Sequence, residues 1–360
     1  MQVDLRKPSE LSDAERGAWR AILDADPTLA SPYFALEFAE CCEEARDDTR
    51  VIVARDRGSI LGFLPLQTGR LGYARPLAGP LGDVHGIIAP RDAGADPARW
   101  LAAAGIPVFS FHSALSGQVG FREAANRPTD GSWVIDVENG FDAWQANRKS
   151  VNAKAMRNIA TRFRRLEEVD GGHSFVMADY RPDVFEVMVR LKRQQYRRTG
   201  LFDVFSVGWT RRLLKAVLRR QGDYFTGVCS SLRVGGEVVS VHVGMASDRM
   251  CHYWFPAYEP DHSRLSPGVL LLVEMVRTAS AIGHFGVELG PGDYGFKKDL
   301  ASYQTGLVGG RIVTPSLRGS LVRAGENMAE ACAKMPFGPL GRIPQRGFRK
   351  LDRLAGFLRW

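Results

Sequence analysis

The chain has 360 residues, more than one hydrophobic core usually supports, so two domains are expected. Its apolar share of 45% and charged share of 24% fit a globular protein and argue against a disordered one. The net charge of +8 favours anionic partners. Because the chain shows no long apolar run, we expect neither a signal peptide nor a membrane span, and hence a cytoplasmic protein.

The first 140 residues predict a small α/β domain. Asp56-Arg57-Gly58 is typical of a tight turn between two strands, and Ser31-Pro32 is a helix start signal. The expected elements are a helix at 33–45, strands at 50–54 and 59–67, a helix at 96–104, and strands at 107–112 and 133–137.

Residues 141–315 predict a second domain of mixed α/β (α+β) type with a mostly antiparallel sheet. Gly235-Gly236 is a clear hairpin signal, and Gly283 stands where a helix C-terminal cap is expected. The expected elements are helices at 141–169, 183–199 and 209–220, strands at 224–234, 237–246 and 250–256, a helix at 268–282 and a strand at 285–289.

A candidate anion site lies where a polar loop meets the last of these helices. Pro267 suits the first helical turn, Ser266 is a candidate N-cap, and Gly268 allows close approach to the backbone. Arg264 and Leu265 precede this turn, and a helix N-terminus favours phosphate. Ser-Pro-Gly is equally consistent with the plain start of a core helix.

A glycine-rich loop after the last predicted strand is the best candidate for catalysis. Glu288 is a candidate general base if burial raises its pKa, Asp293 a candidate orienting group and Tyr294 a candidate acid, while Lys297 and Lys298 are candidate substrate contacts. For Glu288 the alternative is an edge carboxylate paired with a lysine.

His242 alternates with apolar residues on a predicted central strand, where it is a candidate general base with a pKa near neutrality. Tyr253, on the next strand, is a candidate wall of the substrate site. A histidine in such a place is more often a hydrogen-bonded core residue, and Tyr253 is equally consistent with packing.

Basic residues gather in three helical segments, which can attract a phosphorylated cofactor, RNA or an acidic membrane or can be solvated helix faces. The residues are Arg148, Lys149, Lys154, Arg157, Arg162, Arg164 and Arg165, then Arg190, Lys192, Arg193, Arg197 and Arg198, then Arg211, Arg212, Arg219 and Arg220. Residues 316–360 form a basic tail whose last turns, around Leu351, Leu354 and Phe357, predict an amphipathic helix able to lie on a membrane or on the protein itself.

Five cysteines without a CxxC pair indicate reduced, buried thiols, and seven histidines without HxxxH or HExxH spacing indicate no metal site.

Several stretches resemble the CelD/BcsL-type acetyltransferases, a GNAT branch tied to polysaccharide synthesis and related to the twin-domain FemAB proteins. They are SPYFALEF, GSILGFLPLQ, GGEVVSVHVGMAS, HYWFPAYEPDHSRLSPGVLLLVEMV and FGVELGPGDYGFKKDLA. The resemblance implies two tandem GNAT-like domains, a degenerate one at 1–140 and an acyltransferase domain at 141–315. It further implies that Arg264 to Gly268 hold the pyrophosphate of acetyl-CoA or another acyl-CoA.

On this resemblance we expect acyl transfer to an amine of a sugar or an exopolysaccharide precursor. Two alternatives stay open. One is FemAB-like transfer from aminoacyl-tRNA, suggested by the basic helices, and the other is a non-catalytic scaffold of polysaccharide assembly that contacts a membrane through the tail.

Overall fold

The computed structural model describes residues 1–69, 72–127, 129–317, 319–320 and 357. These residues fall into two compact units. Unit 1 comprises Met1–Leu29, Arg46–Thr129 and the described residues from Leu307 onward, and unit 2 comprises Ala30–Ala45 and Asp130–Gly306. The predicted division at residue 140 therefore differs from the observed one, because residues 30–45 join the second unit and the chain returns to the first at Leu307. Most of the predicted tail, 316–360, lies outside the described residues.

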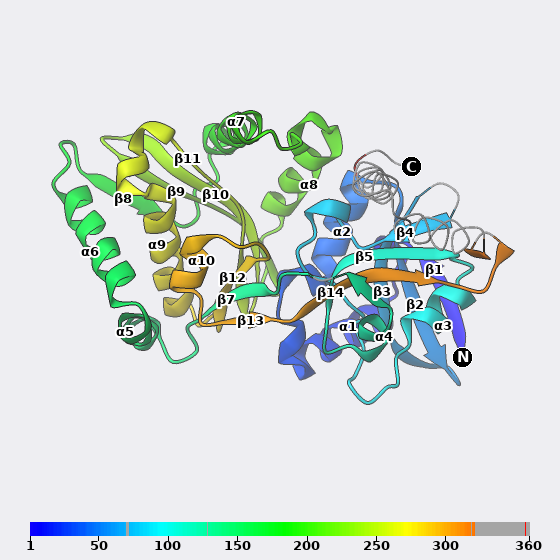
Figure 1. Cartoon of the computed structure of the whole chain (residues 1–360). Coiled ribbons are helices and arrows are strands. Elements are labelled where there is room, and N and C mark those ends of the chain that lie inside the picture. Colours follow the sequence, from blue (N-terminus) through cyan, green and yellow to red (C-terminus); the bar gives the residue numbers. More distant parts are fainter. Residues whose placement is uncertain (70–71, 128, 318, 321–356, 358–360) are drawn as a thin grey trace, which may run out of the picture. The chain divides into compact units, whose positions relative to one another are not determined.

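Unit 1 contains a seven-stranded sheet in the order β1-β2-β3-β4-β5-β14-β6 among the described residues (Figure 1). The strands are β1 (Gln2–Arg6), β2 (Thr49–Asp56), β3 (Ser59–Thr68), β4 (Tyr73–Arg75), β5 (Val108–Leu115), β6 (Ala125–Arg127) and β14 (Leu307–Val313). The helices are α1 (Asp13–Ala25), α3 (Pro97–Ala103) and α4 (Val119–Glu123). The hydrophobic core of unit 1 includes Trp100, Phe109, Phe111 and Phe121.

Unit 2 contains the second seven-stranded sheet of the described chain, in the order β13-β7-β12-β11-β10-β9-β8. Its strands are β7 (Ser132–Asp136), β8 (His173–Val176), β9 (Phe225–Val234), β10 (Glu237–Ser247), β11 (Met250–Tyr258), β12 (Gly286–Gly290) and β13 (Tyr303–Thr305). Its helices are α2 (Leu36–Ala45), α5 (Phe141–Val151), α6 (Ala153–Glu167), α7 (Pro182–Thr199), α8 (Gly208–Arg219), α9 (Pro267–Ala281) and α10 (Gly295–Leu300).

Both sheets are mixed. Antiparallel pairings predominate, as the sequence predicts, but β4 and β5 pair in parallel in unit 1, and β11 and β12 do so in unit 2. In each case a helix, α3 or α9, connects the two parallel strands, because parallel neighbours need a crossover connection. The two units therefore share a strand–helix–strand motif.

Helices cover both faces of the unit 2 sheet. α9 packs on β9 to β12 and is covered in turn by α5 and α6, whereas α7 and α8 pack on β9 and β10 from the opposite face (Figure 1). α9 is apolar nearly all round, with Leu270, Leu271 and Leu272 all fully buried, which is what a helix sandwiched between a sheet and other helices requires.

Local sequence signals place the turns. Gly235 and Gly236 have φ of 57° and 85°, the left-handed values that a two-residue hairpin turn demands, and they join β9 to β10. The predicted helix at 141–169 is interrupted at Asn152, whose side chain accepts a hydrogen bond from Ala155 N at 3.1 Å and caps α6.

The segment 30–45 is part of the interior of unit 2. Phe38 is fully buried, with its ring centroid 6.0 Å from that of Trp254 and 6.5 Å from that of Phe225. At the end of α2, Glu44 forms ion pairs with Arg219 at 2.8 Å and Arg220 at 2.7 Å. An apolar ring and two ion pairs thus fix a segment that is nearly 90 residues distant in sequence from the rest of its unit.

Truncating Phe38 should therefore loosen unit 2. We expect Phe38→Ala to lower the opening free energy of β9 to β11 by roughly 3–5 kcal/mol, because a buried aromatic is lost and a cavity remains. Hydrogen exchange read by mass spectrometry measures this, with Phe109→Ala in unit 1 as the matched control. Faster exchange in β2 and β3 after Phe38→Ala, with β9 to β11 unchanged, would contradict the assignment of this segment to unit 2.

Candidate functional site

Glu288, the leading sequence candidate for catalysis, lies at the centre of a buried polar cluster. Its Oε2 accepts a hydrogen bond from Ser31 Oγ at 2.6 Å, and its Oε1 accepts one from Ser132 Oγ at 2.9 Å. His252 Nδ1 lies 3.2 Å from Oε2, and the other ring nitrogen of His252 lies 3.3 Å from Tyr33 Oη. The three partners of Glu288, namely Ser31, Ser132 and His252, come from separate stretches of the chain.

The electrostatics of this cluster correct the prediction for Glu288. Burial by itself raises the pKa of Glu288, but the hydrogen bond and positive charge of His252, together with the two serine hydroxyls, outweigh burial and hold the pKa below its usual value. Only 2% of the residue is exposed. Glu288 is thus a satisfied carboxylate that organises its neighbours, not a base with a raised pKa.

His242 fills a bulge in β11. The pairing of β10 with β11 shifts between Val243 and Met245, so two residues of β11 oppose one of β10. His242 Nε2 lies 3.2 Å from Trp254 N, from which it accepts a hydrogen bond, and 3.2 Å from His252 O, both of them backbone groups at the bulge. A side chain on Gly244 would collide with this ring, since its Cβ would lie 2.4 Å from Nε2.

The environment of His242 contradicts a general base titrating near neutrality. Burial, the charge of His252 and that of Lys192 lower the pKa of His242 to about 3, despite a backbone hydrogen bond that raises it. The ring is therefore neutral at physiological pH, and its role is to bond to the backbone of the bulge in β11.

Tyr253 supports the start of α9. Its ring stacks on His242 with centroids 4.8 Å apart, and its hydroxyl donates to Gly268 O at 3.0 Å. Burial raises the pKa of this phenol, so it stays a donor. The sequence placed Tyr253 as a substrate contact, and the structure places it beneath the candidate anion site.

The first turn of α9 leaves a backbone donor open. Ser266 has φ of 50°, a left-handed value uncommon outside glycine, and its side chain makes no capping bond, contrary to the N-cap prediction. Val269 N bonds to Ser266 O, whereas Gly268 N has no acceptor among the described residues. Arg264 lies in the exposed 3-10 helix Pro260–Leu265 just before this turn.

β11 and β12 separate beside this turn. They pair only over Met250–His252 and Gly286–Glu288, after which β11 continues to Tyr258 and β12 ends at Gly290. Because the carboxyl ends of parallel strands lie at one edge of a sheet, the turn before α9 and the loop after β12 both begin there. The predicted anion site and the predicted glycine-rich loop thus share this edge.

The loop after β12 divides its predicted residues between interior and surface. Lys297 is buried, and its Nζ donates to Gly290 O at 3.1 Å and to Pro291 O at 2.6 Å. Asp293 and Lys298 form a solvent-exposed ion pair at 2.6 Å. Tyr294 is exposed, with the Lys297 ammonium 5.3 Å from its ring centroid.

Sequence reasoning missed Lys192 and Tyr196 of α7. Burial and the charge of Lys297 lower the pKa of Lys192 to about 8, and burial, Asp203 and Tyr294 raise the pKa of Tyr196 to about 12. The charges of groups that follow β12 thus act on both residues of α7. A signal was present, since Lys192 follows Met188 by four residues and so falls on the apolar stripe of its helix.

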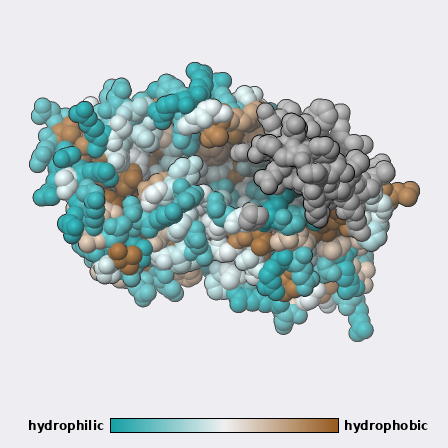
Figure 2. Space-filling model, in the orientation of Figure 1, coloured by the Kyte–Doolittle hydropathy of each residue, from teal (hydrophilic) through white to brown (hydrophobic). Residues whose placement is uncertain are grey.

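The three basic segments differ once their partners are known. In the second and third, Arg190 pairs with Glu259, Arg193 with Asp203, Arg211 with Glu186, and Arg219 and Arg220 with Glu44. In the first, Arg148 is buried and donates to Ala301 O, but Lys149, Lys154, Arg157, Arg162, Arg164 and Arg165 have no carboxylate partner among the described residues. The surface over α6 is accordingly hydrophilic on the face that Figure 2 shows.

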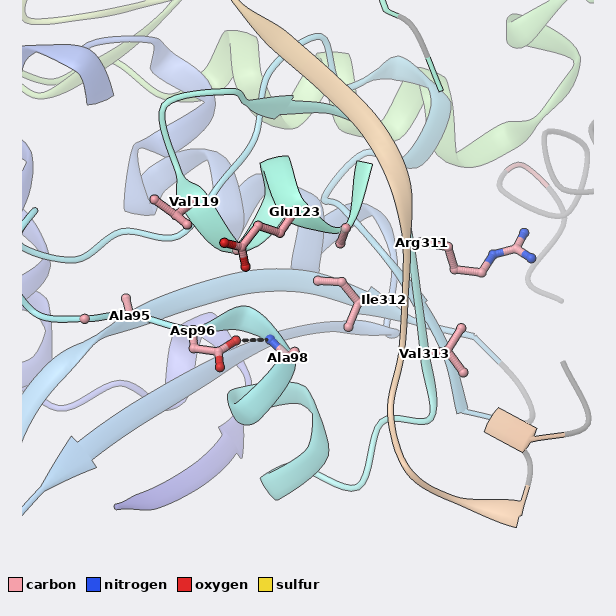
Figure 3. Close-up of a pocket in the computed structure, with 11 residues that line it drawn as sticks. Ala95, Asp96, Ala98, Val119, Glu123, Arg311, Ile312 and Val313 are labelled. Carbon is pink, nitrogen blue, oxygen red and sulfur yellow. Dashed lines mark hydrogen bonds between the residues drawn. The ribbon is translucent and has the colours of Figure 1, made fainter. Parts of the chain in front are cut away.

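A shallow hollow of about 760 Å³ lies in unit 1, and none of the predicted site residues lines it. Its lining includes Asp96 and Glu123, while Arg311 points away from both (Figure 3). The Asp96 carboxylate accepts hydrogen bonds from Ala98 N at 2.8 Å and Arg99 N at 3.3 Å. α3, which holds the place in unit 1 that α9 holds in unit 2, therefore has its own carboxylate where an anion would bind.

No cluster of three metal-ligating side chains occurs in the part of the chain that the structure describes. Within the same part, no helix is both long and apolar enough to cross a membrane. Cys41, Cys42, Cys229 and Cys251 are free and buried.

Comparison with known protein families gives a match for the central part of unit 2. Residues 153–298 match the acetyltransferase (GNAT) domain family. This stretch runs from α6 into α10 and includes the bulge, the open turn of α9 and Glu288.

Solved structures share the fold of most of the chain. FemX is similar with a TM-score of 0.58 at 10% sequence identity, over 90% of this chain and 99% of the FemX chain. The C-terminal domain of an Agrobacterium fabrum protein assigned as a lysylphosphatidylglycerol synthetase gives 0.51 at 12% identity, over 88% and 96%. No curated protein matches this sequence at a significant level. The mixed α/β fold with tandem GNAT-like domains, expected from the sequence, is confirmed.

Removing the charge of Glu288 should destabilise unit 2 in a pH-dependent way. Because the folded-state pKa of Glu288 is lowered, its ionisation stabilises the fold above the unfolded value, near 4.5, and this contribution is lost as the pH falls through the folded pKa. We expect Glu288→Gln to cost about 3–5 kcal/mol at pH 7, as for other broken buried pairs, and progressively less below pH ~4.

Hydrogen exchange of the β10 to β12 amides measures this cost at pH 7 and at pH 3. Glu237→Gln, an exposed carboxylate at the start of β10, is the control and should change little. An equal cost for Glu288→Gln at pH 7 and at pH 3 would show that ionisation of Glu288 does not stabilise the fold.

Proposed function

We propose that the protein is an acyl-CoA-dependent N-acyltransferase whose donor binds in unit 2. The observation that carries the proposal is the open Gly268 amide at the N-terminus of α9, at the edge where β11 and β12 separate. A helix N-terminus with an uncapped donor favours a phosphate group. The match of residues 153–298 to GNAT domains supports a donor of the acyl-CoA type.

In this proposal the pyrophosphate binds to the turn formed by Arg264, Leu265, Ser266, Pro267 and Gly268. The thioester would lie between β11 and β12, and the acceptor amine would attack its carbonyl carbon. The C–N bond forms, the C–S bond breaks, the amine loses a proton and the thiolate of CoA gains one. Tyr294, exposed in the loop between β12 and α10, is the residue we propose to supply that proton.

We propose as acceptor an amine of a sugar or of an exopolysaccharide precursor. The support is the resemblance of the HYWFPAYEPDHSRLSPGVLLLVEMV and FGVELGPGDYGFKKDLA stretches to CelD/BcsL-type acetyltransferases. The comparisons leave the acceptor open, since the named neighbours share only the fold.

Gly268→Ala tests the donor site without disturbing the protein. An added Cβ would meet only Tyr258 Cδ1 at 3.5 Å, an ordinary contact, so folding should be preserved. A bound pyrophosphate would be displaced, and we expect the Kd for acetyl-CoA to rise about tenfold or more in calorimetric titration. Gly17→Ala in α1, where an added Cβ meets nothing within 4 Å, is the control. Unchanged acetyl-CoA binding in Gly268→Ala, or none in the parent protein, would refute the proposal.

A second candidate is transfer from aminoacyl-tRNA, which the unpaired cations of α5 and α6 favour. Arg164 and Arg165 are exposed in the last turn of α6, without carboxylate partners in the described chain. Such a face attracts a polyanion through release of its counterions.

If tRNA is the donor carrier, its affinity should fall steeply with salt, and the double change Arg164→Gln, Arg165→Gln should lower both the affinity and the salt slope. Filter binding across a salt series measures this. The double change Arg211→Gln, Arg219→Gln removes two charges that are already paired and should have less effect. Equal losses in the two double variants, or no tRNA binding, would exclude a specific role for α6.

A further inference from the structure

Tyr33, His252 and Glu288 form a line of contacts through the interior of unit 2. Tyr33 Oη lies 3.3 Å from His252 Nε2, and His252 Nδ1 lies 3.2 Å from Glu288 Oε2. The three side chains come from the short 3-10 helix Pro32–Phe34, from β11 and from β12. In a hydroxyl–imidazole–carboxylate line of this kind, the carboxylate orients the histidine, and the histidine takes the proton of the hydroxyl.

The carboxylate determines which nitrogen of His252 accepts a proton. The pKa of Glu288 is held below its usual value, so its carboxylate is ionised and has no proton to donate. The Nδ1 atom that faces it therefore carries the proton of the neutral ring. This leaves the lone pair on Nε2, the nitrogen that lies next to the Tyr33 hydroxyl, so Tyr33 donates to His252.

Titratable groups from three elements contact His252. They are Tyr33 of the 3-10 helix, Glu288 of β12 and His242 of β10. His242 Nε2 lies 3.2 Å from His252 O, and its ring is neutral because its pKa is lowered to about 3, chiefly by burial. Glu288 is the anion among these three groups, and its charge stabilises an additional proton on the ring of His252.

The line of contacts lies beside the point where the two parallel strands separate. His252 and Glu288 are the last residues that pair β11 with β12, and the thioester is proposed to lie beyond them. Trp254, two residues further along β11, is half-buried, and its ring centroid is 5.8 Å from that of Tyr33. Exposure is 5% for Tyr33 and 0% for His252, so Tyr33 is the end of the line that a substrate can reach.

The line lies on the side of the sheet opposite α9. Val287 and Leu289, on either side of Glu288, belong to the core that α9 forms with the sheet. Because successive strand residues point to opposite faces, Glu288 points away from α9, toward Ser31 and the segment that contains Tyr33. The proposed donor turn is at the start of α9, so donor and acceptor would reach the separated strands from opposite sides.

We propose that Tyr33 takes the proton from the amine of the acceptor sugar, with His252 and Glu288 as positioning residues that pass on and stabilise this proton. This inference rests on the proposed acyltransferase function. An N–H bond of the acceptor ammonium breaks and Tyr33 Oη gains the proton, while the hydroxyl proton of Tyr33 passes to His252 Nε2. The neutral amine then attacks the thioester, and in that step the nitrogen loses one further proton and the thiolate gains one. The imidazolium, paired with Glu288, later returns its proton through Tyr33 to water.

Tyr33→Phe tests the inference, because it removes the hydroxyl and keeps the ring that packs on Phe38 and Trp254. The full chain is assayed with acetyl-CoA and glucosamine as probes, by CoA release across a pH series, and acetyl-CoA affinity is measured by calorimetry. We expect Tyr33→Phe to lower kcat about 100-fold at about pH 6.5 with an unchanged Kd for acetyl-CoA. The deficit should shrink about tenfold or more at about pH 9.5, because the amine then arrives unprotonated.

Two further variants separate catalysis from packing. Tyr180→Phe removes a hydroxyl that donates to Gly227 O at 2.9 Å in the same unit, and it should alter neither kcat nor its pH dependence. His252→Gln should reproduce the loss in kcat of Tyr33→Phe, and the double variant should lose little more, because the two side chains act as one unit. Thermal unfolding checks that each variant is folded.

The outcomes distinguish this inference from the proposed function. A kcat for Tyr33→Phe within about threefold of the parent value, or a deficit that is the same at every pH, would overturn the inference, since a hydroxyl with a packing role alone gives no such pH dependence. Acetyl-CoA binding without acetylation of glucosamine at any pH would overturn the inference for a sugar amine and leave the donor site in place. Absence of acetyl-CoA binding would overturn the proposed function itself.

Discussion

The charge of Glu288 is the constraint on which unit 2 depends. A carboxylate that is almost entirely buried must be compensated, and here Ser31 and Ser132 donate hydrogen bonds to it while His252 Nδ1 lies 3.2 Å from its Oε2. These residues lie on three stretches that are far apart in sequence. Satisfying one carboxylate therefore requires that residues 30–45, β7, β11 and β12 assemble together, which gives the polar cluster a structural role that an apolar core residue would not have.

This cluster also positions the features proposed for acyl transfer. His252 pairs with Glu288 at the last point where β11 and β12 run side by side, and the bulge in β11 begins at the next residue. His242 Nε2 accepts a hydrogen bond from Trp254 N within the bulge, and Gly244 leaves room for its ring. Tyr253, within the bulge, reaches the first turn of α9. A chain of specific contacts thus connects the buried carboxylate to the open helix terminus.

Much of the fold was predictable from the sequence because its signals are local. Glycine pairs, proline at helix starts and apolar periodicity place the strands from β9 to β12 and the helices α7 to α9 close to their observed bounds. The allocation of residues 30–45 to unit 2 was not predictable in this way. It follows from contacts such as Phe38 with Trp254 and Ser31 with Glu288, which join positions more than 200 residues apart and leave no periodic pattern.

The candidate site was predictable by position but not by role. The Ser-Pro-Gly turn and the loop after β12 do share one edge of the sheet. The pKa directions of Glu288 and His242, however, depend on which side chains surround them, and spacing in sequence does not reveal these neighbours. The converse holds for Lys192, whose place on an apolar stripe was visible although its neighbours were not.

The charges of unit 2 are balanced unevenly. The buried acid, Glu288, is surrounded by donors. On α7, Arg190 and Arg193 pair with carboxylates, whereas Lys192 between them donates to the amide oxygen of Gln195, which leaves the cost of its partial desolvation only partly offset. Replacing Lys192 by an apolar residue would remove this desolvation cost at once, so stability alone does not account for a lysine at this position.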